Sequence, residues 1–381
     1  MQSQDHSESD YEKMASWGFN VVRLGLVWRL IEPRQGAYDI QYLMRYVDRE
    51  VAWAKRHGIY LILEMHGGRG WNMKWDGSGA PDWAVTQYSP NNDGLSTWIE
   101  NFWENQTLWT HYANAWSFVA SRYSNEPTIV GYDIMNEPYM WYVPGAFDLT
   151  KERAHQPYML RFHELVVDQI RSVDPNHIVF IEPFLLPDRA TTREAYSWSQ
   201  EQIAFDRPNV VWSPHFYVYS LGATYMKPYT HNDIGILEQA MNSLYATFTQ
   251  FQKPIWIGEF GIEERVPGSD IWTKDVVDLL RAHGFGWAWW AYYREHPNEG
   301  SYGLINADGS PRCQFLAYLT DSPQRDTLCP SRSFTASASQ VGNQAVPYVP
   351  WILLIAGLIV IGLTVRLSRR SVRPLVSAKH A

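Results

Sequence analysis

The chain has 381 residues, enough for one large barrel or two medium domains. Its formal net charge is −8, and Lys and Arg do not cluster before the far C-terminus, which argues against a nucleic-acid-binding protein. Its 19 Trp and 23 Tyr are unusually many, and such flat amphipathic rings suit stacking against sugar faces as well as core packing.

The order of predicted elements begins with a helix within residues 1–18, for which Ser7 is the N-cap and Asp10 lies three residues on. Seven short apolar runs that end in polar residues then predict strands: Val21 to Leu26, Ile59 to Met65, Ile129 to Ile134, His177 to Glu182, Val210 to His215, Ile255 to Glu259 and Gly286 to Trp290. Amphipathic stretches between them predict helices: Tyr42 to His57, Leu108 to Tyr123, Tyr158 to Val173, Ile236 to Gln252 and Trp272 to His283.

This strict alternation implies parallel strands in an α/β fold, either a barrel or a doubly wound sheet. The barrel is favoured because candidate functional residues end five or more of the runs, which is how a barrel arranges its site. We therefore expect a (β/α)8 TIM barrel over residues 1–320. The chain begins too late to supply the first strand, so we expect a truncated start, an unpaired strand edge and a gap in the barrel wall.

The C-terminal region predicts a membrane anchor. Residues 349–365 carry no charge, and the predicted transmembrane helix covers 346–365. The basic tail, 366–381, would be cytoplasmic and the body extracellular by the positive-inside rule. Residues 321–345 are typical of a flexible stalk. A cleaved C-terminal sorting signal is the alternative.

The cysteines and histidines limit other chemistry. Cys313 and Cys329 are the only two cysteines, and outside the cell we expect them to be bridged, although two reduced thiols are the alternative. His163 and Glu164 resemble the start of a zinc motif, but Val167 stands where the second His is needed. The sequence therefore predicts no metal site.

Two glutamates carry the functional hypothesis. Glu137 in Asp133-Ile-Met-Asn-Glu-Pro138 and Glu259 in Ile255-Trp-Ile-Gly-Glu-Phe-Gly261 each end an apolar run, 122 residues apart. With roughly 40 residues per strand and helix unit, strands three units apart can direct their side chains into one crevice. Paired carboxylates in a crevice cleave glycosides, with one protonated and the other ionised.

At this point the sequence resembles glycoside hydrolase family 5, the cellulase-type retaining hydrolases. The resemblance covers about Tyr11 to Leu319 and rests on these segments: Gly18-Phe-Asn-Val-Val-Arg-Leu24, Met65-His66, Met135-Asn-Glu-Pro138, His215-Phe-Tyr217, Gly258-Glu-Phe-Gly261 and Trp290. It implies a (β/α)8 barrel with no metal or organic cofactor.

The resemblance also implies the roles of the residues around the sugar. Glu137 would be the acid/base and Glu259 the nucleophile, held by bonds from Arg23 and Tyr217. Asn136 would hold the sugar 2-hydroxyl. Arg23 could instead be a structural ion pair, although beside Glu259 it would favour the ionised carboxylate.

Three further rings would complete the site by the same resemblance. His66 and His215 would line it and orient the sugar and the acid, and Trp290 would form the floor of the subsite that holds the cleaved residue. Both histidines could instead be core residues. Other indoles could be subsite platforms or loop-packing residues: Trp28, Trp71, Trp75, Trp83 and Trp141.

The sequence predicts a glycoside substrate but indicates less directly which glycoside it is. Residues 76–84 and 17–26 are similar to the endoglycoceramidase-like branch, which cuts the sugar-ceramide bond of glycosphingolipids. Gly67 and Gly68 depart from that branch, which usually carries Gln-Asp there. The chain also has no room after Leu319 for the branch's C-terminal β-sandwich. We expect a glycolipid or related β-glucoside. The alternatives are a polysaccharide hydrolase of cellulase, β-glucanase or mannanase type, and a non-catalytic carbohydrate-binding barrel.

Overall fold

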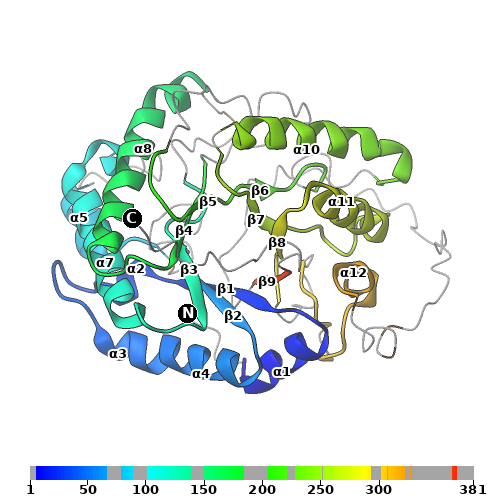
Figure 1. The fold of residues 1–381 in the computed structure, drawn as a ribbon, viewed down its shortest axis with the longest axis horizontal. Helices are drawn as coiled ribbons and strands as arrows, with labels where there is room; N and C mark the ends of the chain where they lie inside the picture. Colours follow the sequence, from blue (N-terminus) through cyan, green and yellow to red (C-terminus); the bar gives the residue numbers. More distant parts are fainter. Residues whose placement is uncertain are drawn as a thin grey trace, which may run out of the picture.

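The structure is a computed structural model that describes residues 6–66, 79–88, 101–138, 149–183, 205–220, 228–250, 252–292, 302–306, 308–321, 327, 329 and 363–366. Strands form the centre of the molecule and helices surround them (Figure 1). The strands are β1 (Val21–Leu26), β2 (Tyr60–Met65), β3 (Ile129–Asp133), β4 (Ile178–Ile181), β5 (Val210–Trp212), β6 (His215–Phe216), β7 (Trp256–Phe260), β8 (Gly286–Trp289) and β9 (Leu363–Arg366). All seven predicted strands are confirmed.

The strands follow the order β5-β4-β3-β2-β1-β9-β8-β7-β6. β5 and β6 together occupy one position in the wall, separated by Ser213 and Pro214. The circle closes where Trp212 bridges Ile255 in parallel and the backbone N–H of Gly258 donates to the Pro214 carbonyl at 3.0 Å. Eight wall positions result, as a (β/α)8 barrel requires.

The helices lie outside the strands. They are α1 (Glu8–Ser16), α2 (Trp28–Ile31), α3 (Ile40–Tyr42), the π-helix η1 (Leu43–Val47), α4 (Asp48–Arg56), α5 (Asp82–Tyr88), α7 (Gln106–Tyr123), α8 (Leu149–Arg171), the 3-10 helix η3 (His231–Asp233), α10 (Ile234–Thr249), α11 (Ser269–His283) and α12 (Cys313–Leu319). The predicted helices are confirmed in position. Their ends follow ordinary capping chemistry: the Ser7 backbone N–H donates to Asp10 at 2.8 Å, and α11 ends at left-handed Gly284.

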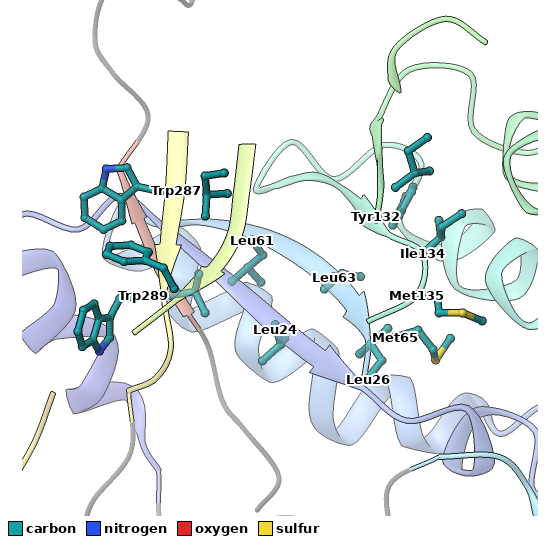
Figure 2. Close-up of a cluster of buried hydrophobic side chains, with 14 of the residues drawn as sticks. Leu24, Leu26, Leu61, Leu63, Met65, Tyr132, Ile134, Met135, Trp287 and Trp289 are labelled. Atoms are coloured by element: carbon teal, nitrogen blue, oxygen red, sulfur yellow. The ribbon is translucent and has the colours of Figure 1, made fainter. Parts of the chain in front are cut away.

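The core has two parts because strand side chains alternate between the two faces of the wall. The larger part lies between strands and helices and includes Leu24, Leu61 and Trp287, which are shown in Figure 2. A smaller cluster of Val21, Ile62, Phe180, Trp256 and Ala288 is packed separately. Two residues after Val21 along β1 comes Arg23, so alternation points this guanidinium to the same face as Val21. The apolar cluster therefore forms the floor beneath a polar site.

The wall between β1 and β8 differs from the prediction. β9 pairs antiparallel with β1, where Val365 lies opposite Val21, and with β8, where Val365 lies opposite Ala288. The predicted gap and unpaired edge are therefore wrong for this structure. The physical reason is that two facing strand edges present unpaired N–H and C=O groups, and an extended segment of any origin satisfies them.

The same strand corrects part of the membrane-helix prediction. Residues 363–365, the end of the predicted helix, are extended in β9, and Arg366 of the predicted tail lies opposite Trp287 in the barrel wall. Residues 346–362 and 367–381 lie outside the described part of the chain. Among the described residues, no helix combines the length and apolar character that crossing a bilayer requires.

The two cysteines form the bridge that the sequence predicts. Cys313 at the start of α12 is bonded to Cys329, with 5.3 Å between the Cα atoms. The bridge ties residue 329 back to the end of the barrel domain. Most of the predicted stalk, 321–345, lies outside the described residues, so the domain boundaries stay predictions.

Candidate active site

All eight predicted site residues lie in the described part of the chain, and all but Arg23 lie near the carboxyl ends of the strands; Arg23 is the third residue of β1, and its guanidinium reaches Glu259. The eight are Arg23 in β1, His66 after β2, Asn136 and Glu137 after β3, His215 in β6, Tyr217 after it, Glu259 in β7 and Trp290 after β8. In a barrel of parallel strands these ends open on one face, which is where such folds hold their sites.

The two glutamates meet. One oxygen of Glu137, one oxygen of Glu259 and one ring nitrogen of His215 all lie within 4.8 Å of one another. Retaining glycosidases keep their carboxyl groups about 5 to 5.5 Å apart, whereas inverting enzymes need about 6.5 to 9.5 Å to admit a water molecule. This close approach of one oxygen from each glutamate favours the retaining geometry over the inverting one.

A register shift in β7 turns Glu259 towards the site. Ile257 and Phe260 both pack in the outer core, which strict alternation would not allow, and the pairing of β7 with β8 shifts between these two residues. Glu259 consequently points inward. Its Oε1 accepts a hydrogen bond from Arg23 Nη1 at 2.8 Å, and its Oε2 accepts one from the Tyr217 hydroxyl at 2.9 Å. Both predicted contacts to the nucleophile are present.

The pKa of Glu259 lies above its ordinary value. Burial is the main cause, and repulsion from Glu137 adds to it, while His215 and Arg23 act in the opposite direction. Arg23 therefore lowers the pKa of Glu259, as expected, but the net shift of that pKa is upward. The reason is that the side chain is only 4 % exposed, so loss of hydration outweighs the guanidinium.

Arg23 is the centre of a wider ion-pair network. Its Nε donates to Asp133 at 2.8 Å, and its Nη2 donates to Asn136 at 3.0 Å and to Glu182 at 2.7 Å. Glu64 lies 3.7 Å from the same Nη2. A buried guanidinium needs such partners to offset its desolvation. Arg23 is therefore both a ligand of the proposed nucleophile and a structural ion pair.

The network holds more carboxylates than cations, so protonation must balance part of the charge. Burial, together with Glu182 and Glu64, raises the pKa of Asp133 well above its usual range, although Arg23 opposes the shift. Asp133 consequently takes up a proton at higher pH than an exposed aspartate does. Arg23 and the two histidines face the carboxylates of the network.

His66 and Trp290 form one side of the site. The His66 ring stacks on the Trp290 ring, with 5.5 Å between centroids and 9° between planes. Burial alone would lower the pKa of His66, but Glu64, 3.1 Å from its Nδ1, raises it to about 9. Trp287 and Trp289 are buried in the outer core, whereas Trp290 stays partly exposed. Of these three indoles, Trp290 is the one beside the site.

Glu137 occupies an unusual backbone conformation. Its φ is 44°, in the left-handed region that residues with a Cβ avoid. Its backbone N–H donates to Glu182 Oε2 at 2.8 Å, and its side-chain Oε1 lies 3.0 Å from His215 Nδ1. The side chain remains 18 % exposed, so a substrate can reach it.

Three acidic residues of the network were not predicted as site residues: Glu64, Asp133 and Glu182. The sequence did contain a signal for one of them, because Glu182 is the polar residue that ends the predicted strand His177 to Glu182. Asp133 opens the segment that contains Glu137. The sequence did not indicate that these three carboxylates surround the Arg23 guanidinium.

The other aromatic candidates divide into two groups. Trp28 is buried and donates from Nε1 to Glu32, and the Trp83 indole donates to the Glu32 carbonyl, so both are loop-packing residues. Trp71, Trp75 and Trp141 lie outside the described residues, as do Gly67 and Gly68.

The same triad offers ligand atoms for a metal ion, because Glu137, His215 and Glu259 each present one within 4.8 Å of the others. Burial lowers the pKa of His215, but Glu182 and Glu259 outweigh burial and raise it well above its usual value.

Comparison with known proteins agrees with this geometry. Endoglycoceramidase I of Rhodococcus hoagii (strain 103S) is 24% identical over 308 residues, covering 74% of this chain and 59% of that protein. Endoglucanase C of Acetivibrio thermocellus is 21% identical over 357 residues, covering 82% and 90%. Over the first three relatives, the chain spans 42% to 59% of their length.

Solved structures show the same fold. Endo-glycoceramidase II from Rhodococcus sp., in a cellobiose-like isofagomine complex, superposes with a TM-score of 0.66 at 24% identity, covering 83% of this chain and 74% of that one. That protein has also been solved as a lactosyl-enzyme intermediate and as a ganglioside GM3 complex. The family model of Cellulase (glycosyl hydrolase family 5) matches residues 1–296. The chain therefore belongs to glycosyl hydrolase family 5, a family of retaining O-glycosyl hydrolases.

Proposed function

We propose that the protein is a retaining β-glycoside hydrolase that works through a covalent glycosyl-enzyme intermediate. The observation that carries the proposal is the approach of the Glu137 and Glu259 carboxylates to within 4.8 Å. Both stand on the rim of the barrel with the neighbours that such chemistry needs.

In the first step, a carboxylate oxygen of Glu259 forms a bond to the anomeric carbon while the glycosidic C–O bond breaks. Glu137 gives its proton to the leaving oxygen. In the second step, a water molecule gives a proton to Glu137 and attacks the anomeric carbon, which frees Glu259. Two inversions leave the anomeric configuration unchanged.

The contacts around Glu259 fit this sequence of events. Arg23 and Tyr217 each hold one carboxylate oxygen, which fixes the orientation of the nucleophile. Burial destabilises the charged carboxylate, and bond formation removes that charge. Attack on the anomeric carbon therefore relieves an unfavourable ground state.

The substrate we propose is a glycolipid or related β-glucoside. The similarity of residues 17–26 and 76–84 to endoglycoceramidases supports this choice, as do the endoglycoceramidase relatives. Similarity to an endoglucanase of comparable length favours polysaccharide as the second candidate. His66 and Trp290 supply a flat surface that suits a sugar ring in either case.

We also propose that the catalytic domain is extracellular and membrane-anchored through residues 346–365. The uncharged run of residues 349–365 and the bridge between Cys313 and Cys329 support an exported, anchored protein. Residues 363–365 are extended in β9. They can pair with β1 and β8 in the barrel wall or form the end of a bilayer-spanning helix, but not both at once. Flotation with vesicles, with and without residues 346–381, separates the two placements: anchorage requires that only the full chain floats.

The substrate proposal is tested by incubating the full chain with a glycosylceramide and, separately, with a β-1,4-glucan. Products are separated by chromatography. Release of intact oligosaccharide from the lipid alone supports the glycolipid substrate, and cutting of the glucan alone contradicts it. Binding of both without release of reducing sugar would identify a non-catalytic carbohydrate-binding barrel. Glu259→Gln, which removes the nucleophile, is the control for contaminating hydrolases.

A further inference from the structure

The Glu182 side chain contacts both the backbone of the proposed acid/base residue and the imidazole beside its carboxyl group. It follows β4 directly and is 2 % exposed. Its Oε2 accepts a hydrogen bond from the Glu137 backbone N–H at 2.8 Å. Its Oε1 lies 3.2 Å from His215 Nε2, and His215 Nδ1 lies 3.0 Å from Glu137 Oε1. Glu182 therefore contacts Glu137 directly at its backbone N–H and indirectly, through the His215 ring, at its carboxyl group.

The backbone contact has a defined task. Glu137 has a φ of 44°, which costs free energy for a residue with a Cβ unless its surroundings fix it. The carboxylate of Glu182 supplies a charge-assisted hydrogen bond at that residue, and such bonds are roughly twice as strong as neutral ones. The bond holds the peptide in the orientation that points the Glu137 side chain at Glu259.

The imidazole contact has a second task. A ring that is charged donates from both nitrogens, so one N–H can face Glu182 while the other faces Glu137. The charged or ionisable groups that face His215 are Glu64, Glu137, Glu182, Glu259 and Tyr217. Of the carboxylates in direct contact with the ring, Glu182 lies beside Nε2, whereas Glu137 and Glu259 lie beside Nδ1.

We propose that Glu182 is a positioning residue that fixes the acid/base Glu137 through its backbone N–H and through the His215 ring. The proposal rests on the proposed function of Glu137. Glu182 itself lies behind these groups, so it acts through Glu137 and His215. The hydrogen bond from Arg23 Nη2 at 2.7 Å anchors the Glu182 carboxylate in place.

The test is Glu182→Gln with two substrates that differ only in the leaving group, 2,4-dinitrophenyl β-lactoside and octyl β-lactoside. Dinitrophenolate leaves without a proton, whereas octanol needs one from Glu137. We expect kcat/KM for the octyl glycoside to fall by on the order of 100-fold, the scale of acid catalysis, and that for the dinitrophenyl glycoside by no more than about threefold. Azide attacks the glycosyl-enzyme intermediate without a general base, so it should raise the kcat of Glu182→Gln for the dinitrophenyl glycoside.

Two variants control for a purely structural effect. Glu50→Gln removes another buried carboxylate, one that bonds His6 and Tyr11 far from the site, and should not separate the two substrates. Glu182→Asp keeps the charge but withdraws it by one methylene, so we expect a smaller separation than in Glu182→Gln. Equal losses for both substrates in Glu182→Gln, or failure of both Glu182 variants to fold, would overturn the positioning role.

A readout without turnover keeps this proposal distinct from the proposed function. In ¹⁵N-histidine NMR, the His215 ring should lose its proton at lower pH in Glu182→Gln than in the native protein, because Glu182 raises the His215 pKa. His66, whose pKa depends chiefly on burial and Glu64, is the internal reference. An unchanged His215 titration contradicts the proposal. A native protein that hydrolyses neither lactoside contradicts the proposed function instead.

Discussion

The catalytic rim of the barrel and the seam between β1 and β8 are built by different kinds of interaction. At the rim, side chains of fixed identity converge: Arg23 alone contacts Glu64, Asp133, Glu182 and Glu259. At the seam, β9 is held by backbone pairing, three residue pairs to each neighbour. Interactions between specific side chains can be identified from sequence motifs. Backbone pairing cannot, because almost any extended segment can supply the N–H and C=O groups. The rim should therefore tolerate substitution far less than the seam.

The largest effect is expected at the nucleophile. Glu259→Gln should reduce turnover by about 10⁴-fold or more, because an amide does not form the covalent intermediate. Ligand binding should survive, since Arg23 and Tyr217 remain in place. Steady-state kinetics and calorimetric titration measure the two properties. Glu263→Gln, where the carboxylate pairs with Arg265, is the matched control and should keep its activity.

The next largest effect is expected at Arg23. Arg23→Met leaves the buried carboxylates without their shared cation and should lower the free energy of unfolding by about 3 to 5 kcal/mol. Urea denaturation measures this change. Arg56→Met, which breaks an exposed ion pair with Glu8, should change stability far less. Similar losses in both variants would contradict the account of the network.

The rim should also make stability depend on pH. The pKa of His66 is about 9 in the folded protein and 6.5 ordinarily, so the charged ring favours folding. This contribution is complete below pH 6.5 and is lost as pH rises to about 9, by at most about 3 kcal/mol. His215 acts in the same direction. Denaturation midpoints measured from pH 6 to 9.5 should fall less steeply in His66→Gln; an unchanged slope would contradict the assignment.

The smallest effect is expected at the seam. Val365→Pro removes a backbone N–H from β9, and we expect a loss of about 1 to 2 kcal/mol with little change in kcat. Val365→Ala keeps the N–H and should cost less. Hydrogen exchange on β1 and β8 reports whether their edges open. No change in protection in Val365→Pro would show that β9 does not pair there in solution.

The rim was largely predictable because strand ends and site residues coincide in the sequence. The predicted strand Val21 to Leu26 has the same bounds as β1, and Arg23 lies within it. Glu182 could be predicted as the end of a strand, but its contacts with the Glu137 backbone and the His215 ring depend on how three different strands are placed side by side. The role of β9 was not predictable, because an apolar stretch such as Leu363 to Val365 fits a membrane helix and a buried strand equally well.

Covalent trapping tests the central claim most directly. The full chain is incubated with 2,4-dinitrophenyl 2-deoxy-2-fluoro-β-lactoside, which forms the intermediate readily and releases it slowly, and is then digested for mass spectrometry. The retaining mechanism predicts one added fluorolactosyl group on the peptide that contains Glu259, and none in Glu259→Gln. Release of dinitrophenol without an adduct, or an adduct on another residue, would contradict it.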